Sequence, residues 1–116
     1  MKRRPSLKNI LGILGPAANG DCCIIVEGKN DVKALLKAGI PHSRVFQTAQ
    51  TGYDKLEVTI SDFGTYVPLF DFDRTGKRRL NSFMCYFSGT QHKIDVSYSE
   101  KLKSTGIKYI EEINNL

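Results

Sequence analysis

The sequence predicts a single compact α/β domain with a mainly parallel sheet of about four strands and helices on both faces. A chain of 116 residues is long enough for one hydrophobic core and too short for two. Short apolar, β-branched runs alternate with amphipathic helical segments, as they do in βαβ units. Two of the apolar runs end abruptly in carboxylates, which is expected of strands that are buried on both faces until they reach water.

An amphipathic helix is expected between Pro5-Ser6 and Gly15-Pro16, which carry start and stop signals. Its apolar positions follow the i, i+3, i+4, i+7 spacing: Leu7, Ile10, Leu11 and Leu14. We therefore predict an N-terminal helical extension over residues 1–20, followed by the main domain over residues 21–116.

The main domain is expected to begin with a buried strand, Cys22-Cys23-Ile24-Ile25-Val26, that ends at Glu27. Gly28 permits a tight turn, and the next helix follows directly. Asp31 is either the cap of that helix or a carboxylate that supports a neighbouring site, and capping is favoured. A short second strand is predicted over residues 44–49.

A helix is predicted between Gly52 and Gly64, and the strand that follows ends at Asp71. Pro68 donates no ladder hydrogen bond, so it is expected at the first paired position of that strand. Another helix should run from Thr75 with four core residues: Leu80, Phe83, Met84 and Phe87. A fourth strand is predicted over residues 93–96, and a capping box over residues 97–100 opens a last short helix.

The centre of the sequence is the apolar run that ends in Asp71 and Asp73. Residues i and i+2 of a strand point to the same side, so these carboxylates should converge at the carboxyl end of the strand. Converging carboxylates repel unless a proton or cation joins them, and oxygen ligands favour Mg²⁺. Glu27 should lie near the pair if the two strands are neighbours. The alternative is a solvated turn, in which Asp is common.

The composition indicates a soluble protein with a modest excess of positive charge. Seventeen Lys and Arg residues against twelve acidic ones give a net charge of +5, which weakly favours a polyanionic partner. Cys22, Cys23 and Cys85 are expected to be buried free thiols of a reducing compartment, since no spacing resembles a zinc site. No apolar run approaches the ~20 residues of a membrane span. We therefore expect a cytoplasmic protein with no membrane partner.

Two motifs in this order resemble the Toprim domain, which is shared by topoisomerases, primases, recombination proteins and a maturase nuclease of 5S ribosomal RNA. The first is Ile24-Ile25-Val26-Glu27-Gly28-Lys29-Asn30-Asp31, and the second is Leu69-Phe70-Asp71-Phe72-Asp73-Arg74-Thr75-Gly76. The resemblance covers residues 22–96. The tail, Tyr109-Ile110-Glu111-Glu112, is similar to that of small stand-alone, primase-like archaeal members.

The resemblance implies a role for each matching residue. Glu27 corresponds to a glutamate that acts as general acid/base or helps to hold metal. Asp71 and Asp73 correspond to the pair that binds Mg²⁺, with Mn²⁺ as an alternative ion. Gly76 corresponds to the glycine that follows this pair, and Gly28 is expected to permit the tight turn after the first motif's strand. Basic residues in or just after these turns are candidates for phosphate binding, with solvated surface charge as the alternative: Lys29, Arg74, Lys77 and Arg78.

The expected function is Mg²⁺-dependent phosphodiester chemistry on RNA or DNA, as a nuclease or RNA-processing protein. A topoisomerase needs a tyrosine on a separate domain, and a primase needs further segments, for which this sequence has no room. The alternatives are a non-catalytic, metal-dependent nucleic-acid-binding module or one part of a larger assembly with protein partners.

A different family also fits part of the second motif. Asp71-Phe72-Asp73-Arg74-Thr75 matches the DxDxT signature of haloacid-dehalogenase-type phosphatases, in which the first Asp is a covalent nucleophile. That family carries the motif near its N-terminus, with a lysine and an acidic pair well downstream. The later acids of this sequence show no matching constellation, and Glu27 would have no role.

Overall fold

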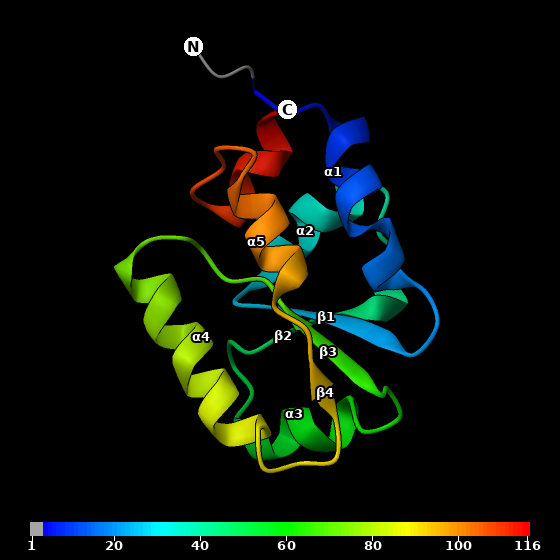
Figure 1. The fold of residues 1–116 in the computed structure, drawn as a ribbon, viewed down its shortest axis with the longest axis vertical. Helices are drawn as coiled ribbons and strands as arrows, with labels where there is room; N and C mark the ends of the chain where they lie inside the picture. Colours follow the sequence, from blue (N-terminus) through cyan, green and yellow to red (C-terminus); the bar gives the residue numbers. More distant parts are fainter. Residues whose placement is uncertain (1–3) are drawn as a thin grey trace.

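The computed structural model describes residues 4–116, so the first three residues of the predicted extension lie outside the described part. Figure 1 shows a central sheet between two groups of helices. The strands are β1 (Cys22–Val26), β2 (Val45–Gln47), β3 (Thr65–Pro68) and β4 (Lys93–Ile94). The α-helices are α1 (Leu7–Leu14), α2 (Lys29–Lys37), α3 (Tyr53–Thr59), α4 (Arg74–Phe87) and α5 (Ser97–Lys103). Three short 3₁₀ helices complete the elements: η1 (Gly15–Ala18), η2 (His42–Arg44) and η3 (Ile110–Asn115).

The four strands form one parallel sheet in the order β2-β1-β3-β4. β1 is central, and its Ile24 lies opposite Val45 of β2 on one side and Val67 of β3 on the other. The predicted fold class is confirmed. Because β1 and β3 are parallel neighbours, the residues that follow them reach the same edge of the sheet.

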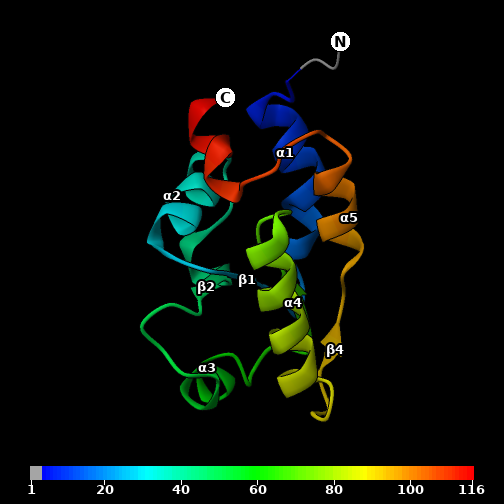
Figure 2. The ribbon, with the colours of Figure 1, turned by 90° about the vertical axis from the view of Figure 1, so that its left-hand side faces the viewer.

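Side chains of β1 point alternately into two hydrophobic cores. Ile24 and Val26 pack in a core with α1, α2, α5 and η3, whereas Cys23 and Ile25 pack in a second core with α3 and α4. Figures 1 and 2 show these helix groups on opposite sides of the sheet. Burial on both faces explains why the strand is an uninterrupted apolar run.

The first helix belongs to the packing of the sheet. Ile10 and Leu14 of α1 are fully buried in the same core as Ile24. Ser6 caps the helix by accepting a hydrogen bond from the Asn9 amide at 3.1 Å. The described part of the predicted extension is thus held against the strands by apolar burial.

Pro68 lies at the end of β3, so its predicted place at the first paired position is wrong. The amide of Leu69 donates to the carbonyl of Ile25 at 2.8 Å, so the nitrogen one residue earlier faces the β4 side. β4 pairs with β3 only at Thr65 and Tyr66. Proline is therefore tolerated because the neighbouring strand has already ended.

Three further predictions about the second half of the chain are wrong. Cys85 is exposed, because it lies on the opposite side of α4 from the buried Phe83 and Phe87. Met84 of the same helix is also exposed. No capping box opens α5, since Asp95 accepts hydrogen bonds from the Ser97 amide and hydroxyl at 2.9 and 2.6 Å.

Among residues 4–116, no helix is long and apolar enough to cross a membrane.

Tyr66→Phe is expected to raise the free energy of unfolding by about 1 kcal/mol. The Tyr66 hydroxyl is buried and has no hydrogen-bond partner among the described residues, while its ring stacks on His92 at 4.6 Å. The same desolvation raises the pKa of Tyr66 to about 12. Urea unfolding of both proteins measures the effect. Tyr109→Phe, at an exposed tyrosine, is the matched control and should leave stability unchanged.

Candidate functional site

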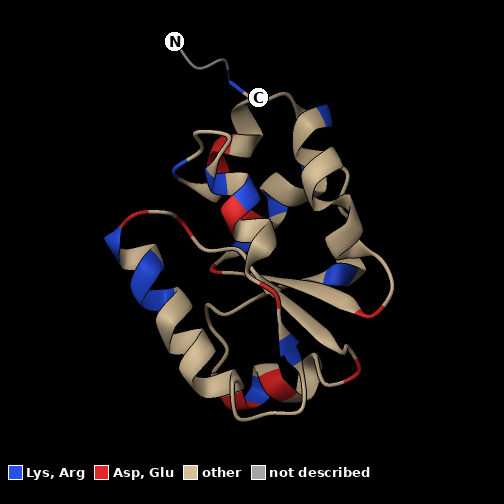
Figure 3. Cartoon of the chain, in the orientation of Figure 1, with Lys and Arg blue, Asp and Glu red and all other residues tan. Residues whose placement is uncertain are grey.

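Glu27, Asp71 and Asp73 line one small cavity at the carboxyl edge of the sheet. The cavity has a volume of about 160 Å³, and its remaining lining residues are Thr75, Gly76 and Arg79. Glu27 directly follows β1, and the two aspartates lie in the loop between β3 and α4. Figure 3 shows this acidic loop leading into the basic first turns of α4. The adjacency of β1 and β3 therefore brings the three predicted carboxylates together.

The two aspartates lie beyond the end of β3, so strand alternation is not what orients them. Asp73 is the N-cap of α4, and its Oδ1 accepts a hydrogen bond from the Gly76 amide at 2.8 Å. Asp71 Oδ1 accepts one from the Ile110 amide, also at 2.8 Å. No hydrogen bond among the described residues uses the second oxygen of either carboxylate, so each can accept another partner.

Gly76 is required by the close approach of α4 to the loop. A Cβ atom built at this position would overlap the backbone carbonyl of Asp71. Gly28 is different, because its φ of −146° is ordinary extended backbone and an added Cβ would meet no atom within 4 Å. Of the two turn glycines, only Gly76 has a steric reason to lack a side chain.

Glu27 contacts a cation that the sequence analysis did not assign to the site. Arg79 Nε of α4 lies 2.6 Å from Glu27 Oε2. This oxygen is buried, yet no donor is aligned to give it a hydrogen bond, so the contact is one of charge alone. In the sequence, Arg79 is the last residue of the basic run Lys77-Arg78-Arg79. The course of α4 brings its side chain to Glu27. The guanidinium covers this oxygen, so Oε2 could bind another cation only if Arg79 moves away.

A second, larger cavity adjoins the first, because Glu27 and Asp71 line both. Its volume is about 420 Å³, and Asp31, Gln47 and Glu111 lie among its walls. Glu111 comes from η3, near the C-terminus, which packs against α2. Neither Gln47 nor Glu111 was predicted as a site residue. The signal for Glu111 in the sequence was the resemblance of the tail, Tyr109-Ile110-Glu111-Glu112, to that of stand-alone Toprim members.

Burial and neighbouring negative charge raise the pKa of two carboxyl groups in this region. Desolvation is the largest cause of the raised pKa of Asp71, and the charges of Asp73, Glu111 and Glu112 add to it. The hydrogen bond from Ile110 acts in the opposite direction. Desolvation also raises the pKa of Asp31 to about 6. A nearby cation stabilises the ionised form of such a carboxyl group.

The predicted phosphate-binding residues divide into two sets. Lys29 lines the larger cavity, and Lys77 borders Asp71 and Gly76 in a small hollow on the other side of the loop. Arg74 and Arg78 are exposed on α4 and line neither carboxylate cavity. Lys29 and Lys77 thus each share a cavity with Asp71, and Arg79 contacts Glu27 directly.

The carboxylates fit a hard divalent cation by their chemistry. Within residues 4–116, no three Asp, Glu, His or Cys side chains form a ready ligand group for one ion. Mg²⁺, however, usually keeps several waters and takes only one or two carboxylates together with substrate phosphate. The unused oxygens of Asp71 and Asp73 match that requirement.

Asp31→Asn is expected to remove a pH dependence of stability. Gly28, and not Asp31, is the N-cap of α2; Asp31 is the third residue of the helix and accepts a hydrogen bond from the Gly28 amide at 3.2 Å, which an asparagine oxygen can also do. Because the folded protein raises the pKa of Asp31 from 3.8 to about 6, it binds more protons than the unfolded chain between these values. This residue therefore lowers stability as pH rises through that window. Thermal unfolding of both proteins from pH 4 to pH 7 should show a stability difference that grows toward neutral pH. A stability difference between the two proteins that does not change with pH would contradict the raised pKa of Asp31.

Comparison with known proteins places the chain among small proteins of similar size. No protein-family model matches it. UPF0292 proteins of Thermococcus onnurineus and Thermococcus sibiricus are 28% identical over 93 residues, which is 80% of this chain and 69% and 73% of theirs. A UPF0292 protein of Methanosarcina barkeri is 28% identical over 99% of this chain and 80% of its own. A solved structure from Aquifex aeolicus aligns with a TM-score of 0.78 and 30% identity, over 89% of this chain and 94% of that one.

Proposed function

For this chain, which belongs to the same family as the Aquifex aeolicus protein, we propose Mg²⁺-dependent phosphodiester chemistry on nucleic acid, as a Toprim-like nuclease or RNA-processing enzyme. One observation carries the proposal. Glu27, Asp71 and Asp73 follow adjacent parallel strands and line a single cavity, and the second oxygens of both aspartates accept no hydrogen bond among the described residues. The order of the two Toprim-like motifs supports the same function.

Asp71 and Asp73 would hold the ion, with Glu27 as third ligand or as proton carrier. A bound divalent ion would offset the negative charge that develops on phosphate oxygens during cleavage. The protein itself fixes the aspartates through the amides of Ile110 and Gly76. These bonds orient the free oxygens without using them, which is the preorganisation that such chemistry needs.

Glu27 is proposed to move a proton at its Oε2 atom. In the absence of substrate, the Arg79 guanidinium lies against that oxygen and balances its charge. The guanidinium is half exposed, so it can turn toward a phosphate when substrate arrives. Lys29 borders the larger cavity and can contact the next phosphate along the strand. The net charge of +5 suits either RNA or DNA.

Cleavage assays with labelled RNA and DNA test this function. The protein is incubated with single-stranded and duplex substrates in Mg²⁺, in Mn²⁺ and in EDTA. The proposal expects cleavage that needs either metal and stops in EDTA. Cleavage that continues in EDTA, or that never occurs with any substrate, would contradict it. Hydrolysis of p-nitrophenyl phosphate in the same buffers would instead support the phosphatase alternative, with Asp71 as nucleophile.

The contact between Arg79 and Glu27 favours a second candidate, a metal-dependent module that binds nucleic acid without cutting it. An arginine that stays on Oε2 occupies the oxygen that the enzyme proposal uses for proton transfer. Binding with no metal-dependent cleavage, by wild type and by Arg79→Gln alike, is the result that this candidate predicts. Restored or faster cleavage in Arg79→Gln would favour the enzyme.

We also propose a cytoplasmic location for this activity. Cys22 and Cys23 are free thiols beside one another on β1, and the second is fully buried. Free thiols persist where the compartment is reducing. RNA and DNA are both present in that compartment. The exposed surfaces of the helices also leave room for protein partners in a larger assembly.

A further inference from the structure

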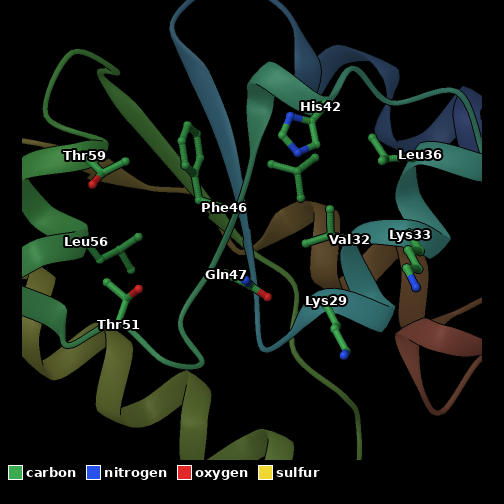
Figure 4. Close-up of a pocket in the computed structure, with 11 residues that line it drawn as sticks. Lys29, Val32, Lys33, Leu36, His42, Phe46, Gln47, Thr51, Leu56 and Thr59 are labelled. Carbon is green, nitrogen blue, oxygen red and sulfur yellow. The ribbon is translucent and has the colours of Figure 1, made fainter.

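A third cavity lies along the free edge of β2, between α2 and α3, as Figure 4 shows. Its volume is about 460 Å³, within the range of pockets that bind small organic groups. Phe46 and Leu56 form an apolar wall on the α3 side, and Val32 and Leu36 form one on the α2 side. Polar groups lie among these apolar walls, including Gln47 and the hydroxyls of Thr51 and Thr59.

This edge cavity adjoins the carboxylate region. Lys29 and Gln47 line both the edge cavity and the larger cavity that contains Glu27 and Asp71. Lys33 follows Lys29 by one helical turn, and both lysines stand at the rim of the edge cavity. A ligand with a flat apolar part in the edge cavity would therefore carry its anionic part past two lysines toward the carboxylates.

We infer that the edge cavity receives an unpaired nucleobase of the strand whose phosphodiester lies at Glu27, Asp71 and Asp73; this rests on the proposed function. A nucleobase has apolar faces and polar edges, which match the apolar walls and the Gln47 amide between them. Its phosphates suit the lysines of α2. A base inside a duplex is stacked on both faces and cannot enter a protein cavity, so the substrate must have unpaired nucleotides at this position.

A second copy of the chain is a poorer occupant of the same edge. Two β2 strands could pair only in antiparallel order about a two-fold axis, which would place α2 of each protomer beside its copy. α2 places Lys29 and Lys33 at the rim of this edge, so like charges would face one another. Charge complementarity therefore favours the polyanion.

Two oligonucleotides of equal length separate base recognition from phosphate recognition. One is fluorescein-labelled oligodeoxythymidylate and the other is its abasic analogue, which keeps the phosphates and lacks the bases. Binding is measured by fluorescence anisotropy in Ca²⁺, a hard cation with the same preference for oxygen ligands. The thymidylate should bind the wild-type protein about tenfold more tightly than the abasic strand and than the corresponding duplex, as expected for one apolar base contact.

Thr59→Trp fills the cavity from the exposed end of α3 and should bring the two single strands to equal affinity. Lys33→Glu should weaken thymidylate binding several-fold, whereas Lys8→Glu, an exposed lysine of α1 outside the cavities described, should change it far less. Circular dichroism checks that each variant is folded. If Thr59→Trp does not fold, Thr51→Trp, at another lining position of the same cavity, takes its place.

Three results would overturn the inference. Equal binding of thymidylate and abasic strand by wild type would show phosphate recognition only, and would leave the proposed function standing. A preference for thymidylate that survives in folded Thr59→Trp would place the base elsewhere and free the β2 edge for a peptide strand. Failure of both oligonucleotides, and of oligouridylate RNA of the same length, to bind would overturn the proposed function as well.

Discussion

Glu27→Gln is expected to reduce Mg²⁺-dependent cleavage by roughly a hundredfold to ten-thousandfold, the range that a positioned general acid/base contributes. The amide has the same shape as the carboxylate, so the turn after β1 and its packing are kept. It can neither accept a proton nor hold a cation by charge. Initial rates on the substrate that wild type cleaves best measure the effect.

The affinity for nucleic acid should change little in the same variant, because phosphate contacts are assigned to cations and not to Glu27. Glu57→Gln is the matched control, since Glu57 lies on α3 and lines none of the cavities described. It should cleave at the wild-type rate. Full activity of Glu27→Gln would show that Glu27 takes no part in the chemistry.

Gly76→Ala is expected to lower the free energy of unfolding by about 2 kcal/mol or more and to abolish metal-dependent activity. The added methyl group would overlap the backbone carbonyl of Asp71, so the first turn of α4 must move away from the loop. That movement breaks the hydrogen bond from the Gly76 amide to Asp73 and displaces both aspartates.

Gly12→Ala provides the contrast, because Gly12 lies inside α1 and an added Cβ meets no atom within 4 Å. There the substitution should stabilise the protein by about 0.5–1 kcal/mol, since alanine is the better helix former. Guanidinium unfolding of the three proteins measures both effects. A Gly76→Ala protein as stable and active as wild type would show that the close approach is not needed.

The fold could be predicted because its signals are local. β1 is an apolar run that is buried on both faces, and α1 is a helix with a regular apolar stripe between clear start and stop residues. The proximity of Glu27 to Asp71 followed from one further assumption, that their strands are neighbours, and the sheet order confirms it. Parallel strands of such a sheet end at one edge, so two carboxylates at strand ends meet there.

The parts of the site that depend on distant contacts could not be predicted. Asp71 is oriented by the amide of Ile110, a contact between residues 39 positions apart that involves a backbone group present in any residue. Arg79 reaches Glu27 because of the direction in which α4 leaves the loop, and the basic run before it carries no sign of which cation will do so. Glu111 enters the larger cavity because η3 packs on α2.

Binding of Mn²⁺ observed by nuclear magnetic resonance tests the central claim, that the carboxylate cavity holds a divalent ion, without reliance on activity. A paramagnetic ion broadens amide signals near it. We predict selective broadening for residues 27–31, 71–76 and 110–111 of the wild-type protein, reversed by excess Mg²⁺ and lost in Asp71→Asn. Broadening that is centred elsewhere, or that is unchanged in Asp71→Asn, would contradict the assignment of the metal to this site.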